Sequence, residues 1–206
     1  MEEDSYQLCE NIDSVVDAYE YGNSFYTFTA GPASFIVLNP YTEYGVSSAQ
    51  YRFVVNTLEA IDRSVTPWLF VVVHNPWYHT FNIHFLELMM KEEYEPLFVK
   101  YKVNVVFSGH IHAYSRSESM AFNVVDKEGK SPIYITIGDS GLGASREGVG
   151  FKSSTAEDWV VSRDIEGSSF GTIEILNRTH TIFKRICVLS SKELDRAVIK
   201  NQFYLK

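Results

Sequence analysis

Two short, almost continuous runs of apolar residues stand out in the pattern of hydrophobic and polar positions. The first is WLFVVV at Trp68–Val73, and the second is VNVVFS at Val103–Ser108. A strand covered on both faces shows such a run, because neither face meets water. The pattern therefore predicts two buried strands. We expect Val71–Val73 and Val103–Phe107 to be neighbours in one sheet.

Two segments with helical periodicity lie close to these runs. Tyr51–Arg63 places apolar residues at positions 51, 54, 55, 58 and 61. Those steps of three and four indicate an amphipathic helix. Phe85–Lys102 predicts a second helix, bent or interrupted at Pro96. Strand, helix and strand in this order predict a βαβ unit with parallel neighbouring strands.

The remaining segments predict further strands, a long loop and a short helix. Phe25–Asn39 predicts two strands joined by a Gly-Pro turn. Gly138–Gly167 is rich in glycine and serine and predicts a long loop, and we expect a short helix after Val188. Four more strands are predicted, at Met120–Val125, Ile133–Ile137, Gly171–Leu176 and Thr181–Ile186.

Length and composition favour one domain. The chain has 206 residues, and 45% of them are apolar, which is ample material for a single core. The organisation that we expect is a polar lead-in over residues 1–24, a folded domain over 25–187 and a C-terminal tail over 188–206. The cysteines Cys9 and Cys187 are too few to define a disulfide framework, so their pairing is left open.

Charge limits the partners of the chain. The formal net charge of −8 repels nucleic acid and anionic lipid, so we expect neither a nucleic-acid nor a membrane partner. It would also repel a phosphate substrate unless a metal centre supplied local positive charge. The acidic start, MEEDSYQLCE, lacks the basic and apolar regions of a signal peptide. Oligomeric state is left open by the sequence.

Histidines follow both predicted buried strands. His74 ends the first strand, and His110 and His112 follow the second after Gly109. Ligand sites in open α/β sheets lie beyond the carboxyl ends of the strands. In extended backbone, residues two apart project to the same side, with Cα atoms roughly 6–7 Å apart. Such imidazoles suit one metal, or two metals about 3.5–4 Å apart. We therefore expect the three histidines to converge on a metal site.

The other histidines carry weaker signals. His84 lies at the expected start of the second helix. There it can donate a proton to a leaving group or hydrogen-bond phosphate oxygens, or it is a helix-terminal surface histidine. We expect His79 to be a loop residue and His180, which lies just before the last predicted strand, to be structural.

The histidine motifs resemble those of a known family. VVVHNPWY (Val71–Tyr78) and FSGHIHAYSRS (Phe107–Ser117) are similar to the two histidine motifs of purple acid phosphatases, especially the larger plant-type members. GHxH alone is shared by many metallophosphoesterases, but the order and combination of motifs here is specific. The resemblance covers about Phe25 to Ile186 and includes AQY at 49–51, TPWL at 66–69, YITIGDSG at 134–141 and SFGTIEILNRTH at 169–180.

The resemblance implies a fold, an activity and residue roles. The fold is an α/β metallophosphoesterase-like β-sandwich flanked by helices, of which this chain holds the C-terminal part. The activity is hydrolysis of phosphate monoesters by an acid phosphatase, at a dinuclear centre of iron with zinc, manganese or iron. His74 and His110 resemble ligands of the divalent metal, and His112 resembles a ligand of iron(III). His84 aligns with the histidine that assists phosphate binding and leaving-group protonation. A secreted location is also implied, in which the sequon Asn177-Arg178-Thr179 would be a glycosylation acceptor.

Three earlier motifs of the family have no counterpart in this sequence. They are Asp-x-Gly, Gly-Asp-x-x-Tyr and Gly-Asn-His-Asp/Glu, which supply two aspartates, a tyrosine and an asparagine to the metals. Asp139 stands in a Gly-Asp pair but lacks the tyrosine at the right spacing. One hypothesis is a truncated phosphomonoesterase with an incomplete metal centre. The other is a non-catalytic, degenerate phosphatase-like domain that binds metal weakly or serves as an interaction module.

Overall fold

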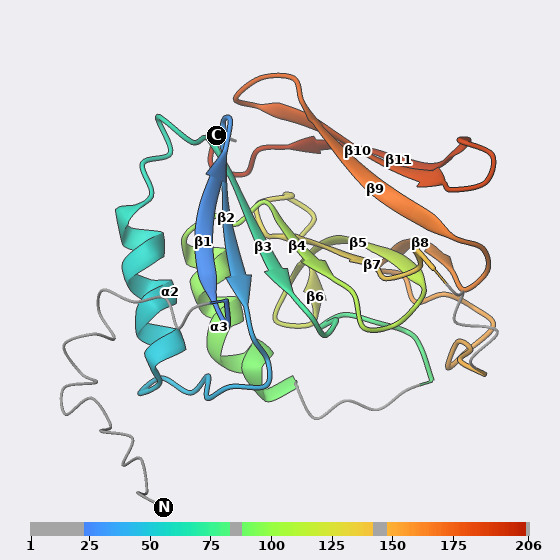
Figure 1. Cartoon of the computed structure of the whole chain (residues 1–206), viewed down its shortest axis with the longest axis horizontal. Helices are drawn as coiled ribbons and strands as arrows, with labels where there is room; N and C mark the ends of the chain where they lie inside the picture. The colour runs from blue at the N-terminus through green and yellow to red at the C-terminus, as the bar shows by residue number, and fades with distance from the viewer. Residues whose placement is uncertain (1–22, 83–87, 142–147, 205–206) are drawn as a thin grey trace, which may run out of the picture.

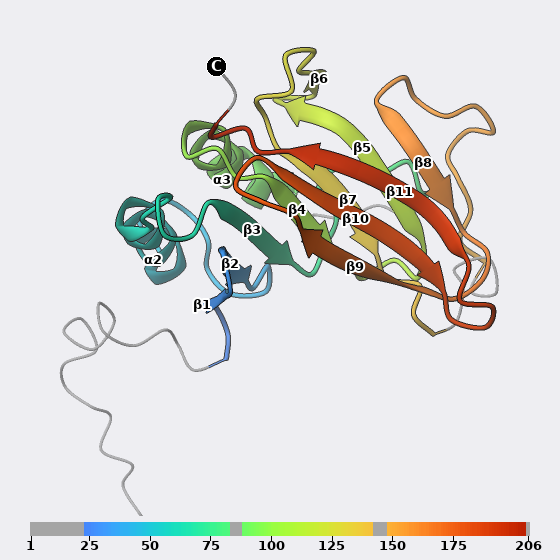
Figure 2. The same cartoon turned by 90° about the horizontal axis from the view of Figure 1, so that it is seen from above.

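The computed structural model describes residues 23–82, 88–141 and 148–204. Almost all of the predicted lead-in, together with Cys9, lies outside the described residues. A large mixed sheet forms the centre of the described part (Figure 1). Two helices cover one face of this sheet, and a smaller antiparallel sheet covers the other face (Figure 2). Neither of these helices has the length and apolar character that crossing a bilayer requires.

The large sheet places the predicted strands side by side. Its order among the described strands is β1-β2-β3-β4-β7-β5-β6, and β8 also pairs with β5. The pairs β2–β3, β3–β4 and β4–β7 are parallel, and Val71 of β3 faces Val106 of β4. The predicted pairing of the two buried strands is therefore confirmed. The bounds are β1 Tyr26–Ala30, β2 Ala33–Leu38, β3 Trp68–Val73, β4 Val105–Ser108, β5 Tyr114–Ala121, β6 Val124–Val125, β7 Ile133–Ile137 and β8 Val160–Asp164.

The two predicted helices are confirmed with shifted ends. α2 spans Ala49–Ala60 and begins two residues earlier than predicted, because the Ser48 side chain accepts a hydrogen bond from the backbone N–H of Tyr51. α3 spans Leu88–Lys100 and contains Pro96 within its length. A short turn after Lys100 leads into β4, so β3, α3 and β4 together form the predicted βαβ unit.

The smaller sheet corrects one prediction. It consists of β9 (Ser169–Ile175), β10 (His180–Cys187) and β11 (Glu193–Lys200), paired antiparallel in the order β11-β10-β9. The short helix predicted after Val188 is wrong, because Glu193–Lys200 forms β11. Ala197 and Ile199 of this strand are buried, whereas Val198 between them is 59% exposed. That alternation of period two is typical of a half-buried strand.

Two further differences concern polar strands. β8 lies inside the segment predicted as a long loop. β5 begins at Tyr114, six residues before the predicted start at Met120. Ser115, Arg116 and Ser117 of β5 are buried because β7 and β8 pair with the two edges of this strand. Their polar composition hides the strand from an analysis of hydrophobic pattern.

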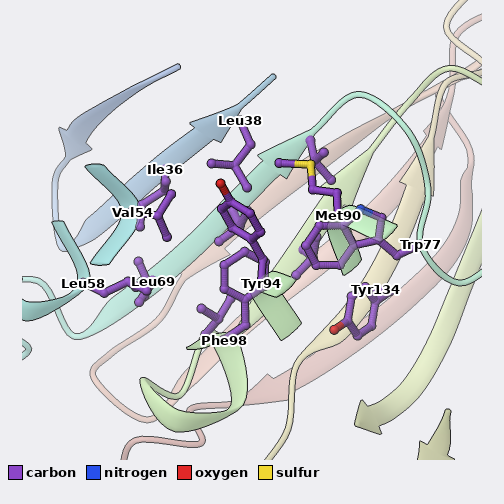
Figure 3. Close-up of a cluster of buried hydrophobic side chains, with 14 of the residues drawn as sticks. Ile36, Leu38, Val54, Leu58, Leu69, Trp77, Met90, Tyr94, Phe98 and Tyr134 are labelled. Carbon is purple, nitrogen blue, oxygen red and sulfur yellow. The ribbon is translucent and has the colours of Figure 1, made fainter. Parts of the chain in front are cut away.

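Two apolar layers hold the sheets and helices together. The layer between the large sheet and the helices contains Leu69, Tyr94 and Phe98 (Figure 3). The layer between the two sheets contains Phe70, Tyr114 and Phe183. Full burial of side chains of this size stabilises the fold by about 1.5–3 kcal/mol each. Both faces of β3 are thereby covered, as its continuous apolar sequence predicts.

Polar side chains join the smaller sheet to β5. Asp195 of β11 accepts hydrogen bonds from the Tyr114 hydroxyl at 2.5 Å and from the Arg116 Nε at 2.8 Å. The Arg116 Nη2 donates to the other carboxylate oxygen at 3.0 Å, so the pair is bidentate. Burial alone would raise the pKa of Asp195, but the hydrogen bonds and charge of Arg116 and the hydroxyl of Tyr114 together lower it.

The contact between the two sheets can be tested with two phenylalanines of the smaller sheet. Phe183 is 1% exposed and stacks on Tyr114, whereas Phe170 is 45% exposed. Phe183→Ala should lower the free energy of unfolding by about 3–5 kcal/mol through lost burial and cavity formation. Phe170→Ala, the matched control, should cost less than about 1 kcal/mol. Urea unfolding of both variants measures this, and equal costs would contradict the layer order.

The lowered pKa of Asp195 predicts a pH dependence of stability. Because the folded-state pKa lies below the unfolded value of about 3.9, the stabilisation is present above that value and is lost as the pH falls through the folded-state pKa. Between about pH 6 and pH 2, the unmodified chain should therefore lose more free energy of unfolding than Asp195→Asn loses. Unfolding by urea across this range measures the difference. Parallel losses in the two proteins would show that Asp195 is not stabilised as a carboxylate, and Asp158→Asn, an exposed position, serves as the control.

Candidate metal site at the carboxyl edge of the sheet

Two histidines meet where β3 and β4 end. β3 ends at Val73 and β4 at Ser108, and these two residues face each other in the parallel pair. His74 follows the first strand directly, and His110 follows the second after Gly109. The backbone N–H of Gly109 donates to the carbonyl of His74 at 3.0 Å, which joins the two loops. Parallel pairing therefore delivers both imidazoles to one edge of the sheet.

The imidazoles of His74 and His110 are in direct contact. The His110 Nδ1 lies 2.9 Å from the His74 Nε2, and the ring centroids are 4.8 Å apart at an interplanar angle of 81°. Both residues are exposed, so the pair is open to solvent. Tyr41, which is 66% exposed, lies beside them with its ring centroid 5.9 Å from that of His74. Two ring nitrogens this close can share a proton or bind one divalent ion.

The backbone of the GHIH segment is not extended. His110 has a φ of 61°, in the left-handed region that a non-glycine residue rarely adopts. The N–H of Ile111 donates to the carbonyl of Gly109 at 2.7 Å, and that of Ala113 donates to the carbonyl of Ile111 at 2.7 Å. The chain therefore turns tightly here, and the geometry expected for extended backbone does not apply to His110 and His112.

The structure brings together two of the predicted site residues. His112 lies half-buried in the same turn as His110. Within the described ranges, no group of three or more His, Cys, Asp or Glu side chains is arranged to hold a metal ion. The ligand role of His112 therefore stays a prediction. His84 lies outside the described residues, so its role also stays a prediction.

The two remaining histidines occupy the expected places. His79 lies in the loop after β3, as predicted, and its ring stacks near that of Phe81 at an interplanar angle of 9°. His180 is the first residue of β10, and its Nδ1 lies 2.8 Å from the Thr179 hydroxyl oxygen. Neither joins the histidine pair.

Gly138 supports the histidine turn from the neighbouring strand. It follows β7, and its N–H donates to the carbonyl of Ala113 at 3.1 Å. A β-carbon at Gly138 would lie 2.2 Å from the carbonyl oxygen of Ile111, closer than any real contact. A glycine is therefore needed for the turn to pack here. The Gly-Asp pair is visible in the sequence, but sequence pattern alone predicts no role for it in positioning the histidines.

Asp139, the next residue, is part of a buried ion-pair network. Its carboxylate accepts hydrogen bonds from the Arg185 Nη2 and from the Ser169 hydroxyl, both at 2.6 Å. Arg185 also donates to Asp164 at 2.8 Å, and the side chains of Arg185 and Asp139 are 4% and 2% exposed. Asp139 thus ties the end of β7 to the smaller sheet, which explains an aspartate at this position without a metal.

The loop that follows His74 is anchored by the aromatic residues of the PWY motif. The Tyr78 hydroxyl donates to the Glu95 carboxylate of α3 at 2.7 Å, and the Tyr134 hydroxyl donates to the same oxygen at 3.0 Å. Burial, and then the hydrogen bond to Glu95, raise the pKa of Tyr78. Trp77 stacks on Phe98 of α3 at an interplanar angle of 8°. The aromatic residues close to His74 in the sequence are the signal from which this anchor could have been predicted.

Comparison with known proteins identifies the family of the chain. The model of the calcineurin-like phosphoesterase family matches residues 5–114. The chain belongs to this family. It is 39% identical over 168 residues to a purple acid phosphatase of Glycine max, covering 76% of this chain and 35% of that protein. It is 37% identical over 171 residues to the Fe(3+)-Zn(2+) purple acid phosphatase 12 of Arabidopsis thaliana, covering 77% of this chain and 35% of that protein. The resemblance found in the sequence is thereby confirmed.

Solved structures show the same fold. A purple acid phosphatase from yellow lupin (Lupinus luteus) seeds superposes with a TM-score of 0.76 at 20% identity, over 85% of this chain and 32% of that one. GAP50, described as the anchor in the inner membrane complex of Plasmodium, superposes with a TM-score of 0.59 at 15% identity, over 86% and 53%. The predicted metallophosphoesterase-like sandwich is therefore confirmed. The chain spans about a third of the length of the two sequence relatives described above.

The contact between Gly138 and Ile111 predicts that Gly138→Ala displaces the histidine turn. The added methyl group must push the Ile111 carbonyl away, which should lower the free energy of unfolding by about 1–3 kcal/mol. It should also weaken zinc binding and shift the imidazole NMR signals of His110 and His112. Zinc calorimetry and histidine-labelled NMR spectra measure both effects. Gly141→Ala is the control, because a β-carbon there meets no atom within 4 Å. Unchanged imidazole signals in Gly138→Ala would show that Gly138 does not hold the histidine turn in place.

Proposed function

We propose that this chain carries one part of the active site of a metal-dependent acid phosphatase that hydrolyses phosphate monoesters. The observation that supports this most is the pair of exposed imidazoles, 2.9 Å apart, at the carboxyl edge of the parallel strands. Membership of the calcineurin-like phosphoesterase family supports phosphoester hydrolysis as the chemistry of the site. The match covers 35% of the length of each of the two relatives named purple acid phosphatase, so the activity of a whole protein of this kind belongs to the proposal.

The donor atoms of the site suit one divalent ion. Neutral imidazole nitrogens are common ligands of zinc and similar metals, and His74 and His110 each present one. Iron(III) is a harder cation that favours anionic oxygen ligands. The described residues bring no cluster of carboxylates to this pair. We therefore propose that this chain alone holds at most about one divalent ion, and that a dinuclear iron-containing centre needs further ligands.

A metal bound here would act as a Lewis acid and lower the pKa of a bound water. The residues of the chain have their own tasks. His74 and His110 face solvent, so a phosphate group can reach them without opening of the fold. The net charge of −8 repels a phosphate group. Positive charge from a bound metal at this edge would offset that repulsion and draw the phosphate group to the imidazoles. His112 is proposed as a further ligand, and His84 as the group that assists phosphate binding and leaving-group protonation.

The resemblance also supports a secreted location, which we include in the proposal. Asn177 of the sequon lies exposed between β9 and β10. Its side-chain oxygen accepts hydrogen bonds from the backbone N–H groups of Thr179 and His180, and a glycan would be attached to the amide nitrogen of the same side chain.

A non-catalytic role is the second candidate. It is favoured by the assembly of only two histidines among the described residues. The same fold also occurs in GAP50, which is described as an anchor. In this alternative the chain binds a metal ion weakly or serves as an interaction module, and it makes no contribution to hydrolysis.

A domain replacement separates the two candidates. Residues 25–186 of this chain replace the matching region of the soybean relative. Under the catalytic proposal, the chimaera hydrolyses p-nitrophenyl phosphate at acidic pH, and His110→Ala lowers its turnover at least about 100-fold. The unmodified chain alone should bind at most about one zinc ion and show hydrolysis near background. Metal analysis and a phosphatase assay measure both.

His180→Ala is the control for these measurements, since His180 lies at the start of β10, away from the histidine pair. A chimaera that folds, holds two metals and yet fails to hydrolyse the ester would favour the non-catalytic role. Conversely, robust turnover by the isolated chain, with two metals bound and sensitivity to His110→Ala, would show that residues such as Asp139 supply ligands after all.

A further inference from the structure

A second cleft lies at the opposite end of the parallel strands from His74 and His110. Its volume is about 580 Å³, within the range of small-molecule sites. It is bordered by the ends of α2 and α3 and by the segment that follows β11. Figure 1 shows that the segment directly after β11 lies beside the connection from α2 to β3. The cleft therefore combines parts of the chain that are distant in sequence.

The cleft is rich in positive charge. Arg63, Lys100, Lys102 and Arg178 line it, against two carboxylates. Those carboxylates belong to Glu59 and Asp62. Glu59 accepts a hydrogen bond from the Tyr101 hydroxyl at 3.2 Å, and Asp62 Oδ1 accepts one from the backbone N–H of Ser64 at 2.8 Å. The local excess of cations is opposite in sign to the net charge of −8 of the chain.

Arg63 is the buried cation of this cleft. It is 7% exposed, and its guanidinium donates to the carbonyls of Pro67 and Tyr101 at 2.8 and 3.1 Å and to the Asn104 side-chain oxygen at 3.0 Å. All of these acceptors are neutral, and no ion pair of Arg63 occurs among the described residues. Burial lowers the pKa of Arg63 to about 10, so it keeps its charge at neutral pH. A buried charge balanced only by dipoles leaves a positive potential in the adjoining space.

Lys102 adds an independent observation. Its φ is 57°, and the next N–H, that of Val103, donates to the carbonyl of Phe98 at 2.9 Å. These features place Lys102 at the position after a helix where glycine is usual, because a β-carbon is unfavourable there. A lysine close to a helix C-terminus also interacts favourably with the helix dipole. Its side chain lines the cleft, so the strained position adds a cation to the wall.

Aromatic and aliphatic groups form the rest of the wall. The Phe203 ring lies 4.8 Å from the Arg63 guanidinium carbon. The Tyr204 hydroxyl donates to the Arg63 carbonyl at 2.7 Å, which fixes the C-terminal segment against the cleft. Leu58 and Leu69 also line it. A ligand in this space would meet both cations and apolar surface.

We propose that this cleft binds a small organic anion, in which a carboxylate, sulfonate or phosphate group is joined to an aromatic or aliphatic body. The anionic group binds the side chains of Lys102 and Arg178. The body packs on Phe203 and the leucines. This inference concerns the end of the sheet away from the histidines, and it stands whether or not the chain contributes to phosphatase activity.

The test uses 2-naphthalenesulfonate with the metal-free chain, so that the histidine site holds no metal. Calorimetry should show saturable binding to one site. Lys102→Gly and Arg178→Gln should each weaken binding at least about tenfold, because each removes a charged hydrogen-bond donor. Lys102→Gly replaces a strained residue with glycine, so its stability to urea should be equal or higher. Weaker binding can then not be attributed to loss of fold.

Matched controls isolate each part of the proposal. Ser191→Gly replaces another left-handed residue with glycine outside the cleft. Lys127→Gln removes an exposed charge outside the cleft. Neither substitution should change the affinity. Inorganic phosphate and 2-naphthalenemethanol, which carry the anion or the aromatic body alone, should both bind more weakly. Equal affinity for inorganic phosphate would overturn the requirement for an organic body.

Three results would overturn the site itself. The first is absence of saturable binding, and the second is an affinity that is the same in the unmodified chain, Lys102→Gly and Arg178→Gln. The third is binding that occurs only in a chain shortened to end at Tyr204, because it would show that the end of the chain itself fills the cleft. We expect the shortened chain to bind with unchanged affinity.

Discussion

The parallel pairing of β3 with β4 is the interaction on which the rest of the structure depends. Each strand is covered on both faces, so its polar neighbours in sequence can reach solvent only at the two ends of the sheet. At the carboxyl end this constraint brings His74 and His110 into contact. At the amino end it collects the cations of the second cleft. The chemistry of the two ends therefore follows from one buried core.

Hydrophobic pattern predicted the parts of the fold where burial and periodicity agree. Trp68–Val73 and the helix at α2 are examples, because apolar side chains alone determine their positions. It failed for β5, where pairing with β7 and β8 buries serine and arginine, and for the half-exposed strand β8. It also failed for β11, whose alternation becomes clear only once β10 is placed beside it. Contacts between distant segments, rather than local propensity, determine these strands.

The candidate site, like the fold, could be predicted from the sequence only in part. Position at the end of a buried strand was sufficient to place His74 and His110 together. It does not fix the direction of His112, because a left-handed residue at His110 changes the direction of the chain between the two histidines. Backbone angles of this kind depend on what packs against the turn. The relevant contact, from Gly138 after β7 to the Ile111 carbonyl, joins residues 27 positions apart and has no periodic signature.

That turn shows how the interior maintains the site. A left-handed non-glycine residue costs about 1–3 kcal/mol and persists only where surrounding contacts require it. The His110 turn is held on one side by the hydrogen bond from Gly109 to His74, and on another by the contacts of Gly138 with Ile111 and Ala113. Gly138 is in turn fixed by its neighbour Asp139, which is bound to Arg185 of the smaller sheet. A series of contacts therefore joins the turn that carries His110 to a buried ion pair between the two sheets.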